Sequence, residues 1–164
     1  MKTLYIIRHA KSAWDNPEFS DHERPLMQKG VRKTAKISQY LSEMDIEPDL
    51  IISSTAVRAY ETACLIATAL HYPVDKIKKE ASLYLSDNEQ ILSLIFAVDN
   101  NHKSLMIFGH NPTFTSFANK FLSEKIDWMP TSAVVAVKFD TDKWEEICLS
   151  EKQLKFIVFP KMLK

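Results

Sequence analysis

Short apolar runs alternate with amphipathic stretches through the first three quarters of the chain. The runs at 4–7, 49–54 and 104–108 have the length and the β-branched content of strands that are buried on both faces. After each of them, apolar residues recur every three or four positions, which predicts helices over about 28–43, 56–70, 87–98 and 112–122. Ser54 or Thr55 can cap the second helix, and Asn111 should cap the fourth, with Pro112 at its first position.

Strand-like segments dominate the last quarter of the chain. They lie at 133–139 and 155–159, with a further short strand possible at 144–148. Strands that alternate with helices are typical of an α/β fold. We expect a three-layer sandwich in which a mostly parallel sheet, with one antiparallel edge, is covered by helices on both faces. No repeat or linker divides the sequence, so residues 1–164 should form a single domain.

The composition excludes several classes of function. The 164 residues carry 21 basic and 21 acidic side chains, whereas general binders of nucleic acid or anionic membranes show a basic excess. Cys64 and Cys148 sit among apolar residues that indicate buried thiols in a reducing compartment, and no apolar run is long enough for a signal peptide or a membrane span. A cytoplasmic protein is expected. Gly30 and Gly109 are the only glycines, so a Walker A loop and a dinucleotide-binding fingerprint are both excluded.

Arginine and histidine follow the ends of the three predicted parallel strands. Arg8 and His9 come directly after the first strand, and Arg58 lies in the first turn of the helix after the second. His110 follows the third strand. Because the C-terminal ends of parallel strands meet at one edge of a sheet, these four side chains should converge. Each residue alone has a simpler explanation, such as a surface charge for Arg58 or a partner for a buried carbonyl group for His110.

Two guanidinium and two imidazole groups suit phosphoryl transfer. Guanidinium groups bind a phosphate dianion through paired, charge-assisted hydrogen bonds. One imidazole can attack phosphorus in line, and a second, protonated imidazole can stabilise charge on the equatorial oxygens. No cofactor and no metal ion are required, because the side chains supply the positive charge. A zinc site at His9 and His110 is the competing interpretation, which two adjacent arginines and an incomplete ligand set disfavour.

Several motifs resemble the histidine phosphatase superfamily, also called phosphoglycerate-mutase-like, and within it the short SixA-type phosphohistidine phosphatases. They are Arg8-His9, Arg58 within 53–63, Gly109-His110, Arg24-Pro25-Leu26 with Gly30 following, and Asn111-Pro112 with 131–133 downstream. The resemblance spans nearly the whole chain and implies a phosphoglycerate-mutase-like fold. It implies that His9 is the phosphorylated nucleophile and that Arg8, Arg58 and His110 form the phosphate pocket.

The resemblance also implies roles for two loop residues. Arg24 is similar to an accessory anion-binding arginine of the SixA branch, and Asp21 resembles a loop acid with an acid–base role. The simpler alternatives are an exposed Arg24 paired with a nearby acidic residue and a solvated Asp21 carboxylate.

Two positions depart from the superfamily pattern. Ala10 replaces the usual glycine after the histidine, which is acceptable if its backbone φ is negative. Leu85 stands where mutase-type members place a glutamate that protonates the leaving oxygen. A phosphorylated histidine needs such an acid less, because imidazole, with a conjugate-acid pKa of about 6.5, can be protonated as it leaves near neutral pH.

Three hypotheses for function follow. The first is a phosphohistidine phosphatase that acts on a phosphorylated protein, such as a histidine phosphotransfer domain. The second is a small-molecule phosphomonoesterase of the same superfamily. The third is a non-catalytic phosphate-binding module. Nucleic acids and membranes are not expected partners.

Overall fold

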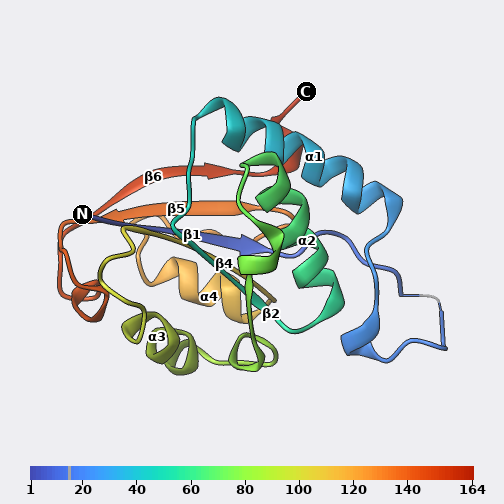
Figure 1. Cartoon of the computed structure of the whole chain (residues 1–164), viewed down its shortest axis with the longest axis horizontal. Coiled ribbons are helices and arrows are strands. Elements are labelled where there is room, and N and C mark those ends of the chain that lie inside the picture. Colours follow the sequence, from blue (N-terminus) through green and yellow to red (C-terminus); the bar gives the residue numbers. More distant parts are fainter. Residues whose placement is uncertain (15) are drawn as a thin grey trace.

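A six-stranded sheet forms the centre of the protein, whose computed structural model describes residues 1–14 and 16–164 (Figure 1). Its strands are β1 (Lys2–Arg8), β2 (Leu50–Ser54), β3 (Lys78–Glu80), β4 (Ser104–Gly109), β5 (Val134–Phe139) and β6 (Lys152–Val158). They lie in the order β3-β2-β4-β1-β5-β6. The first four strands of this order are parallel, whereas β5 runs antiparallel to both of its neighbours.

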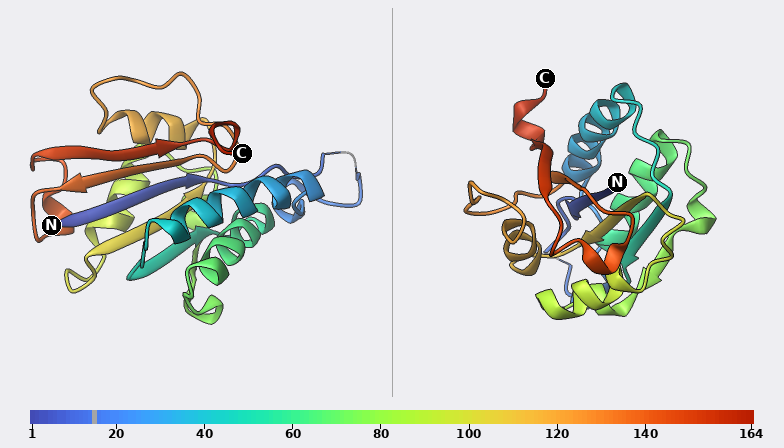
Figure 2. Two further views of the ribbon diagram at one scale, coloured as in Figure 1. Left: turned by 90° about the horizontal axis from the view of Figure 1, so that it is seen from above. Right: turned by 90° about the vertical axis from the view of Figure 1, so that its left-hand side faces the viewer.

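Two helices cover each face of the sheet. The helices are α1 (Gln28–Glu43), α2 (Val57–Ala69), α3 (Asn88–Phe96) and α4 (Thr113–Asn119). Figure 2 shows α1 and α2 on one side of the sheet and α3 and α4 on the other. The α/β fold with a mostly parallel sheet between helical layers, predicted from the hydrophobic pattern, is therefore confirmed.

Strand β1 contributes to two separate hydrophobic cores. Leu4 and Ile6 pack into the core under α3 and α4, whereas Tyr5 and Ile7 pack into the core under α1 and α2. All four side chains are buried, as the continuous apolar run predicts. Burial of side chains of this size contributes roughly 1.5–3 kcal/mol each, so β1 fixes the position of the residues at its C-terminal end firmly.

Some local predictions were wrong. Residues 144–146 form a 3-10 helix, not a strand, because Trp144 is buried and its indole N–H donates to the carbonyl oxygen of His102. Helix α4 is shorter than predicted, and Pro112 is its N-cap; the Asn111 side chain nevertheless accepts the backbone N–H of Thr115. Cys148 is exposed, and only Cys64 is partly buried.

None of the helices in the described ranges combines the length and the apolar character that crossing a lipid bilayer requires.

Candidate active site

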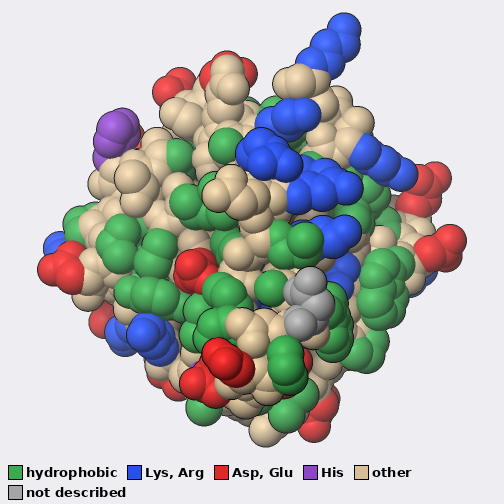
Figure 3. All heavy atoms as spheres, turned by 90° about the vertical axis from the view of Figure 1, so that its right-hand side faces the viewer, with side chains coloured by type: hydrophobic (Ala, Val, Ile, Leu, Met, Phe, Trp, Pro, Cys, Tyr) green, Lys and Arg blue, Asp and Glu red, His purple; other side chains and the backbone are tan. Residues whose placement is uncertain are grey.

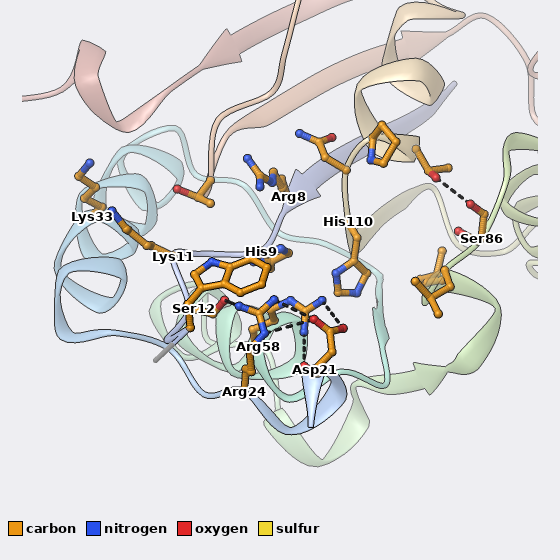
Figure 4. A pocket seen from close by; sticks show the side chains of 17 residues that line it. Arg8, His9, Lys11, Ser12, Asp21, Arg24, Lys33, Arg58, Ser86 and His110 are labelled. Carbon is orange, nitrogen blue, oxygen red and sulfur yellow. Dashed lines mark hydrogen bonds and ion pairs between the residues drawn. The ribbon is translucent and has the colours of Figure 1, made fainter. Parts of the chain in front are cut away.

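Strands β1 and β4 bring two histidines to the same edge of the sheet. The strands pair in parallel with Arg8 opposite Gly109, so His9 and His110 follow at equivalent positions. Their ring centroids lie 5.1 Å apart. Both rings line a cavity of about 830 Å³, which Arg8, Arg24, Arg58 and Asp21 also line (Figure 4). The structure thus gathers all six residues singled out in the sequence into one site.

The His9 ring is held in one tautomer. Its Nδ1 lies 2.7 Å from the carbonyl oxygen of Ala10, which can only accept, so Nδ1 carries the proton and Nε2 keeps a free lone pair. Burial is the main cause that lowers the pKa of His9 to about 3, and the charges of the nearby arginines add to it. The ring is therefore neutral at neutral pH, as a nucleophile must be.

His110 is oriented by Ser54 at the end of β2. The Ser54 hydroxyl lies 2.7 Å from Nε2 of His110 and accepts the backbone N–H of Ala56, so donating its own proton to Nε2 satisfies the hydroxyl best. Nδ1 of His110 then carries a proton, and it is buried without a hydrogen-bond partner among the described residues. Burial lowers the pKa of His110 to about 3, with the charges of His9 and Arg58 as further causes. His110 thus offers a neutral N–H donor to the cavity at neutral pH.

Arg8 and Arg58 reach the cavity from different elements. Arg8, the last residue of β1, donates through Nη1 to the carbonyl oxygen of Met129 at 3.0 Å. Arg58, in the first turn of α2, is 6% exposed. The Nε atom of each guanidinium is buried and has no hydrogen-bond partner in residues 1–14 and 16–164. Each arginine therefore retains a hydrogen-bond donor for an anionic ligand.

Arg24 and Asp21 form an ion pair inside the site. Nε and Nη2 of Arg24 both donate to Oδ1 of Asp21, at 3.2 and 3.0 Å. The Arg24 side chain is buried, and its guanidinium stacks 3.7 Å from the ring centroid of Trp14. The alternative of an exposed Arg24 is therefore wrong, although its pairing with a nearby carboxylate is confirmed.

Asp21 also pairs with Arg58 and accepts a hydrogen bond from Tyr84. The Tyr84 hydroxyl donates to Oδ2 at 2.6 Å, and Nη2 of Arg58 lies 3.1 Å from the same oxygen. The Tyr84 hydrogen bond and the Arg58 charge lower the pKa of Asp21 to about 2. Asp21 is therefore a carboxylate at neutral pH and holds no proton to donate in this arrangement.

The two departures from the superfamily pattern have different structural outcomes. Ala10 keeps a negative φ, and its N–H donates to the Thr62 hydroxyl of α2 at 2.9 Å, so the extra methyl group is accommodated. Leu85 lines the cavity, has a positive φ of 52° and is 82% exposed. An apolar side chain thus occupies the rim where mutase-type members place an acid.

Positive charge at the site comes from side chains. Across residues 1–14 and 16–164, no group of three or more His, Cys, Asp or Glu side chains is arranged to hold a metal ion. Lys11 and Lys33 line the cavity in addition to the three arginines. The zinc interpretation of His9 and His110 finds no third ligand among the described residues.

Sequence reasoning missed several residues of the site. Ser54 was considered only as a helix cap, whereas its hydroxyl contacts His110. Trp14, Lys33 and Tyr84 reach the cavity or its network from a loop, a helix and a turn that no strand-end pattern marks. A tryptophan within a loop of mostly polar residues was the only available signal for Trp14.

A family model and a curated relative match the chain. Residues 4–81 match the model of the histidine phosphatase superfamily (branch 1). An uncharacterized chloroplastic protein of Arabidopsis thaliana is 29% identical over 153 residues, which cover 88% of this chain and 70% of that protein.

Two solved structures share the fold over almost the full length. The proposed phosphohistidine phosphatase SixA of Agrobacterium tumefaciens is 27% identical, with a TM-score of 0.82, over 97% of this chain and 98% of that one. The protein histidine phosphatase SixA in complex with tungstate is 22% identical, with a TM-score of 0.84, over 99% of each chain. At the latter identity the likeness concerns the fold alone.

Proposed function

The chain belongs to the histidine phosphatase superfamily, branch 1, and we propose that it hydrolyses phosphohistidine on a protein, through a covalent phosphohistidine on its own His9. One observation carries this proposal. A neutral imidazole with a free Nε2 lies in the same cavity as Arg8, Arg58 and the N–H group of His110.

In the first step, Nε2 of His9 attacks the phosphorus atom of the substrate. The new P–N bond forms as the P–N bond of the substrate histidine breaks, and that imidazole leaves with the electron pair and takes a proton from solvent. The guanidinium groups of Arg8 and Arg58 bind the phosphoryl oxygens. Nδ1–H of His110 donates to the same group, and once the dianion is bound, its charge raises the pKa of His110 toward the protonated form.

In the second step, water attacks phosphorus and the bond to Nε2 of His9 breaks. The products are inorganic phosphate and neutral His9, and the proton of the attacking water passes to the phosphate and solvent. The hydrogen bond from Nδ1 of His9 to the Ala10 carbonyl oxygen keeps the ring in place through both steps.

The leaving group distinguishes this proposal from phosphomonoester hydrolysis. An alkoxide is expelled with difficulty unless an acid protonates it. Asp21 is ionised and Leu85 has no ionisable group, so neither side chain can supply that proton. An imidazole leaves without such help near neutral pH. The name of the Agrobacterium tumefaciens structure, a proposed phosphohistidine phosphatase, supports the same substrate class.

The test is phosphoryl transfer to His9. Incubation with a radiolabelled, histidine-phosphorylated phosphotransfer domain should label the enzyme with acid-labile phosphate and release inorganic phosphate. His9→Ala should reduce the release rate by at least about a thousandfold, because the covalent route is lost. His102→Ala, which changes a histidine outside the cavity, is the control.

A panel of small phosphates separates the alternatives. Rapid turnover of sugar or nucleotide phosphates without turnover of phosphohistidine would identify a phosphomonoesterase. Phosphate binding without any labelling of His9 would identify a non-catalytic module. Either result would contradict the proposal.

A further inference from the structure

Every charged side chain in the first three turns of helix α1 is basic. Lys29, Arg32, Lys33 and Lys36 fall within one face of the helix by their spacing. Three of them are exposed and Lys33 is half-buried. Among the described residues, none of the four has a carboxylate within 4.0 Å. Figure 3 shows a row of Lys and Arg side chains across the side of the molecule that lies at the right of Figure 1.

This arrangement weakens the helix that carries it. The first turn of α1 contains no acidic residue, so its cations oppose the helix dipole. Lys29 and Lys33 lie four residues apart, as do Arg32 and Lys36, and like charges at this spacing repel. In a chain with equal numbers of basic and acidic residues, such a concentration is more readily explained by binding than by folding.

The cationic face continues into the candidate active site. Lys33 lines the cavity, together with Lys11 from the segment that follows His9 (Figure 4). A macromolecule bound to the cavity through a phosphoryl group would therefore lie against α1.

Two large apolar side chains line the cavity, and a third lies against Arg8, which also lines it. Trp14 is 77% exposed and Leu85 is 82% exposed, and both line the cavity. Trp128 is 53% exposed, and its ring lies over the guanidinium of Arg8 with its centroid 5.7 Å away. Leu85 is held out by a backbone with φ of 52°, a conformation that disfavours leucine. Large apolar side chains that are exposed together usually mark an interaction site.

We propose that the cationic face of α1 and the exposed side chains of Trp14, Leu85 and Trp128 form one docking surface for the protein domain that carries the phosphohistidine. The partner would present an acidic surface beside a small apolar patch at its phosphorylated histidine. This inference rests on the proposed function. An apolar centre with a charged flank is the usual anatomy of a protein–protein interface, and Trp and Arg are enriched among its energetically important residues.

A nucleic acid or a membrane fits these observations less well. Either would gain from the lysines and from the exposed tryptophans, but neither carries the phosphohistidine that the cavity is proposed to bind. The neutral total charge also gives no long-range attraction to a polyanion.

The experiment compares one protein substrate with one small substrate. The probes are a histidine phosphotransfer domain with acidic residues around its phosphohistidine, and free phosphohistidine. Lys29→Glu, Arg32→Glu and Lys36→Glu, combined in one variant, should lower kcat/KM for the phosphorylated domain about 10- to 100-fold and remove most of its salt dependence. Turnover of free phosphohistidine should stay within about twofold, because none of the three residues lines the cavity.

The control variant carries the same change in charge elsewhere. Lys103→Glu, Lys120→Glu and Lys143→Glu replace three exposed lysines that do not line the cavity. This variant should match the wild type on both probes. Equal losses in the two triple variants, or no loss in the α1 variant, would overturn the docking surface while the proposed function stands.

A binding measurement separates the two proposals. The His9→Asn variant should bind the phosphorylated domain without consuming it, and adding the three α1 substitutions should weaken that binding by a similar factor. Binding through α1 without hydrolysis by the wild type would overturn the proposed function alone. An α1 variant that loses affinity for polyuridine or for phosphatidylserine vesicles, with unchanged affinity and rate for the phosphorylated domain, would overturn the docking surface.

Discussion

Oδ2 of Asp21 lies 3.1 Å from Nη2 of Arg58, so an internal carboxylate contacts a guanidinium that the proposed mechanism assigns to the phosphoryl group. Nη1 of Arg58 also donates to the backbone carbonyl oxygen of Asp21, at 2.6 Å. Asp21 thus accepts hydrogen bonds from both Nη atoms of Arg58, the groups that would otherwise bind phosphate. A bound phosphate must compete with it.

Asp21→Asn should therefore bind inorganic phosphate more tightly than the wild type. The Asp21 side chain is 47% exposed, so solvent screens the pair and the expected gain is only about two- to fivefold. Titration calorimetry with phosphate measures it, with Glu23→Gln as the control because Glu23 contacts Ser20 and no arginine. Weaker phosphate binding by Asp21→Asn would show that the carboxylate positions the arginines and does not compete.

Ser54→Ala should impair catalysis through His110. Without the hydroxyl, Nε2 of His110 loses its 2.7 Å partner, and the ring can take the tautomer that withdraws the Nδ1 proton from the cavity. One hydrogen bond of this kind is worth about 1 kcal/mol, so kcat should fall about five- to tenfold with little change in KM. The nitrogen chemical shifts of the His110 ring should report the changed tautomer, and Ser54→Thr should restore both. A normal spectrum with reduced activity would contradict the positioning role.

Stability should fall as the pH drops below about 6.5. The folded-state pKa values of His9 and His110 are about 3, so the unfolded chain binds more protons between pH 6.5 and pH 3. Each histidine can remove up to about 1.4 kcal/mol of unfolding free energy per pH unit in this window. Asp21, with a pKa of about 2, adds a further loss as the pH falls from about 4 toward 2.

Urea unfolding at several pH values measures this dependence. His9→Asn and His110→Asn should each flatten the profile between pH 6.5 and pH 4. Saturating phosphate should flatten it as well, because the anion favours the protonated rings. A profile that the two substitutions leave unchanged would show that other groups control acid stability.

The residues at strand ends were predictable because the strands themselves were. Arg8 and His9 follow an apolar run that is buried on both sides, and the parallel pairing of β1 with β4 then fixes His110 beside His9. The short edge strand β3 was not predictable, because two of its three residues are exposed lysines that give no apolar signal. The strand predicted at 144–148 was wrong for the opposite reason, because a single buried side chain such as Trp144 can anchor a 3-10 turn as well as a strand.

The rest of the site depends on contacts that no local pattern encodes. Arg24 is buried only because the loop folds over the end of β1, where Ser12 and the Ala13 carbonyl oxygen accept its hydrogen bonds. The lowered pKa of Asp21 depends mainly on Tyr84, which is 63 residues away in the chain. Tertiary structure alone reveals that the same carboxylate also pairs with Arg58.

Gly30→Ala should destabilise the protein and disturb the segment after His9. A Cβ atom at Gly30 would clash with the backbone carbonyl oxygen of Lys11, which accepts the N–H of Met27 and cannot simply rotate away. We expect a loss of about 1–3 kcal/mol in unfolding free energy and weaker phosphate binding. Ser42→Ala, at an exposed position of the same helix, should instead be neutral or slightly stabilising. Equal behaviour of the two variants in urea unfolding would refute the close approach of α1 to Lys11.

Leu85→Asn should stabilise the fold while it weakens recognition of the substrate. Asparagine tolerates a φ of 52° better than leucine does, and the Leu85 side chain is 82% exposed, so little apolar burial is lost. The unfolding free energy should rise by about 0.5–1 kcal/mol. Leu149→Asn is the matched control, because Leu149 is 89% exposed with a negative φ and should gain nothing.

The same Leu85→Asn variant should show a severalfold higher KM for the phosphorylated domain. A variant that is more stable and has an unchanged KM would mean that the leucine is strained without a role in docking.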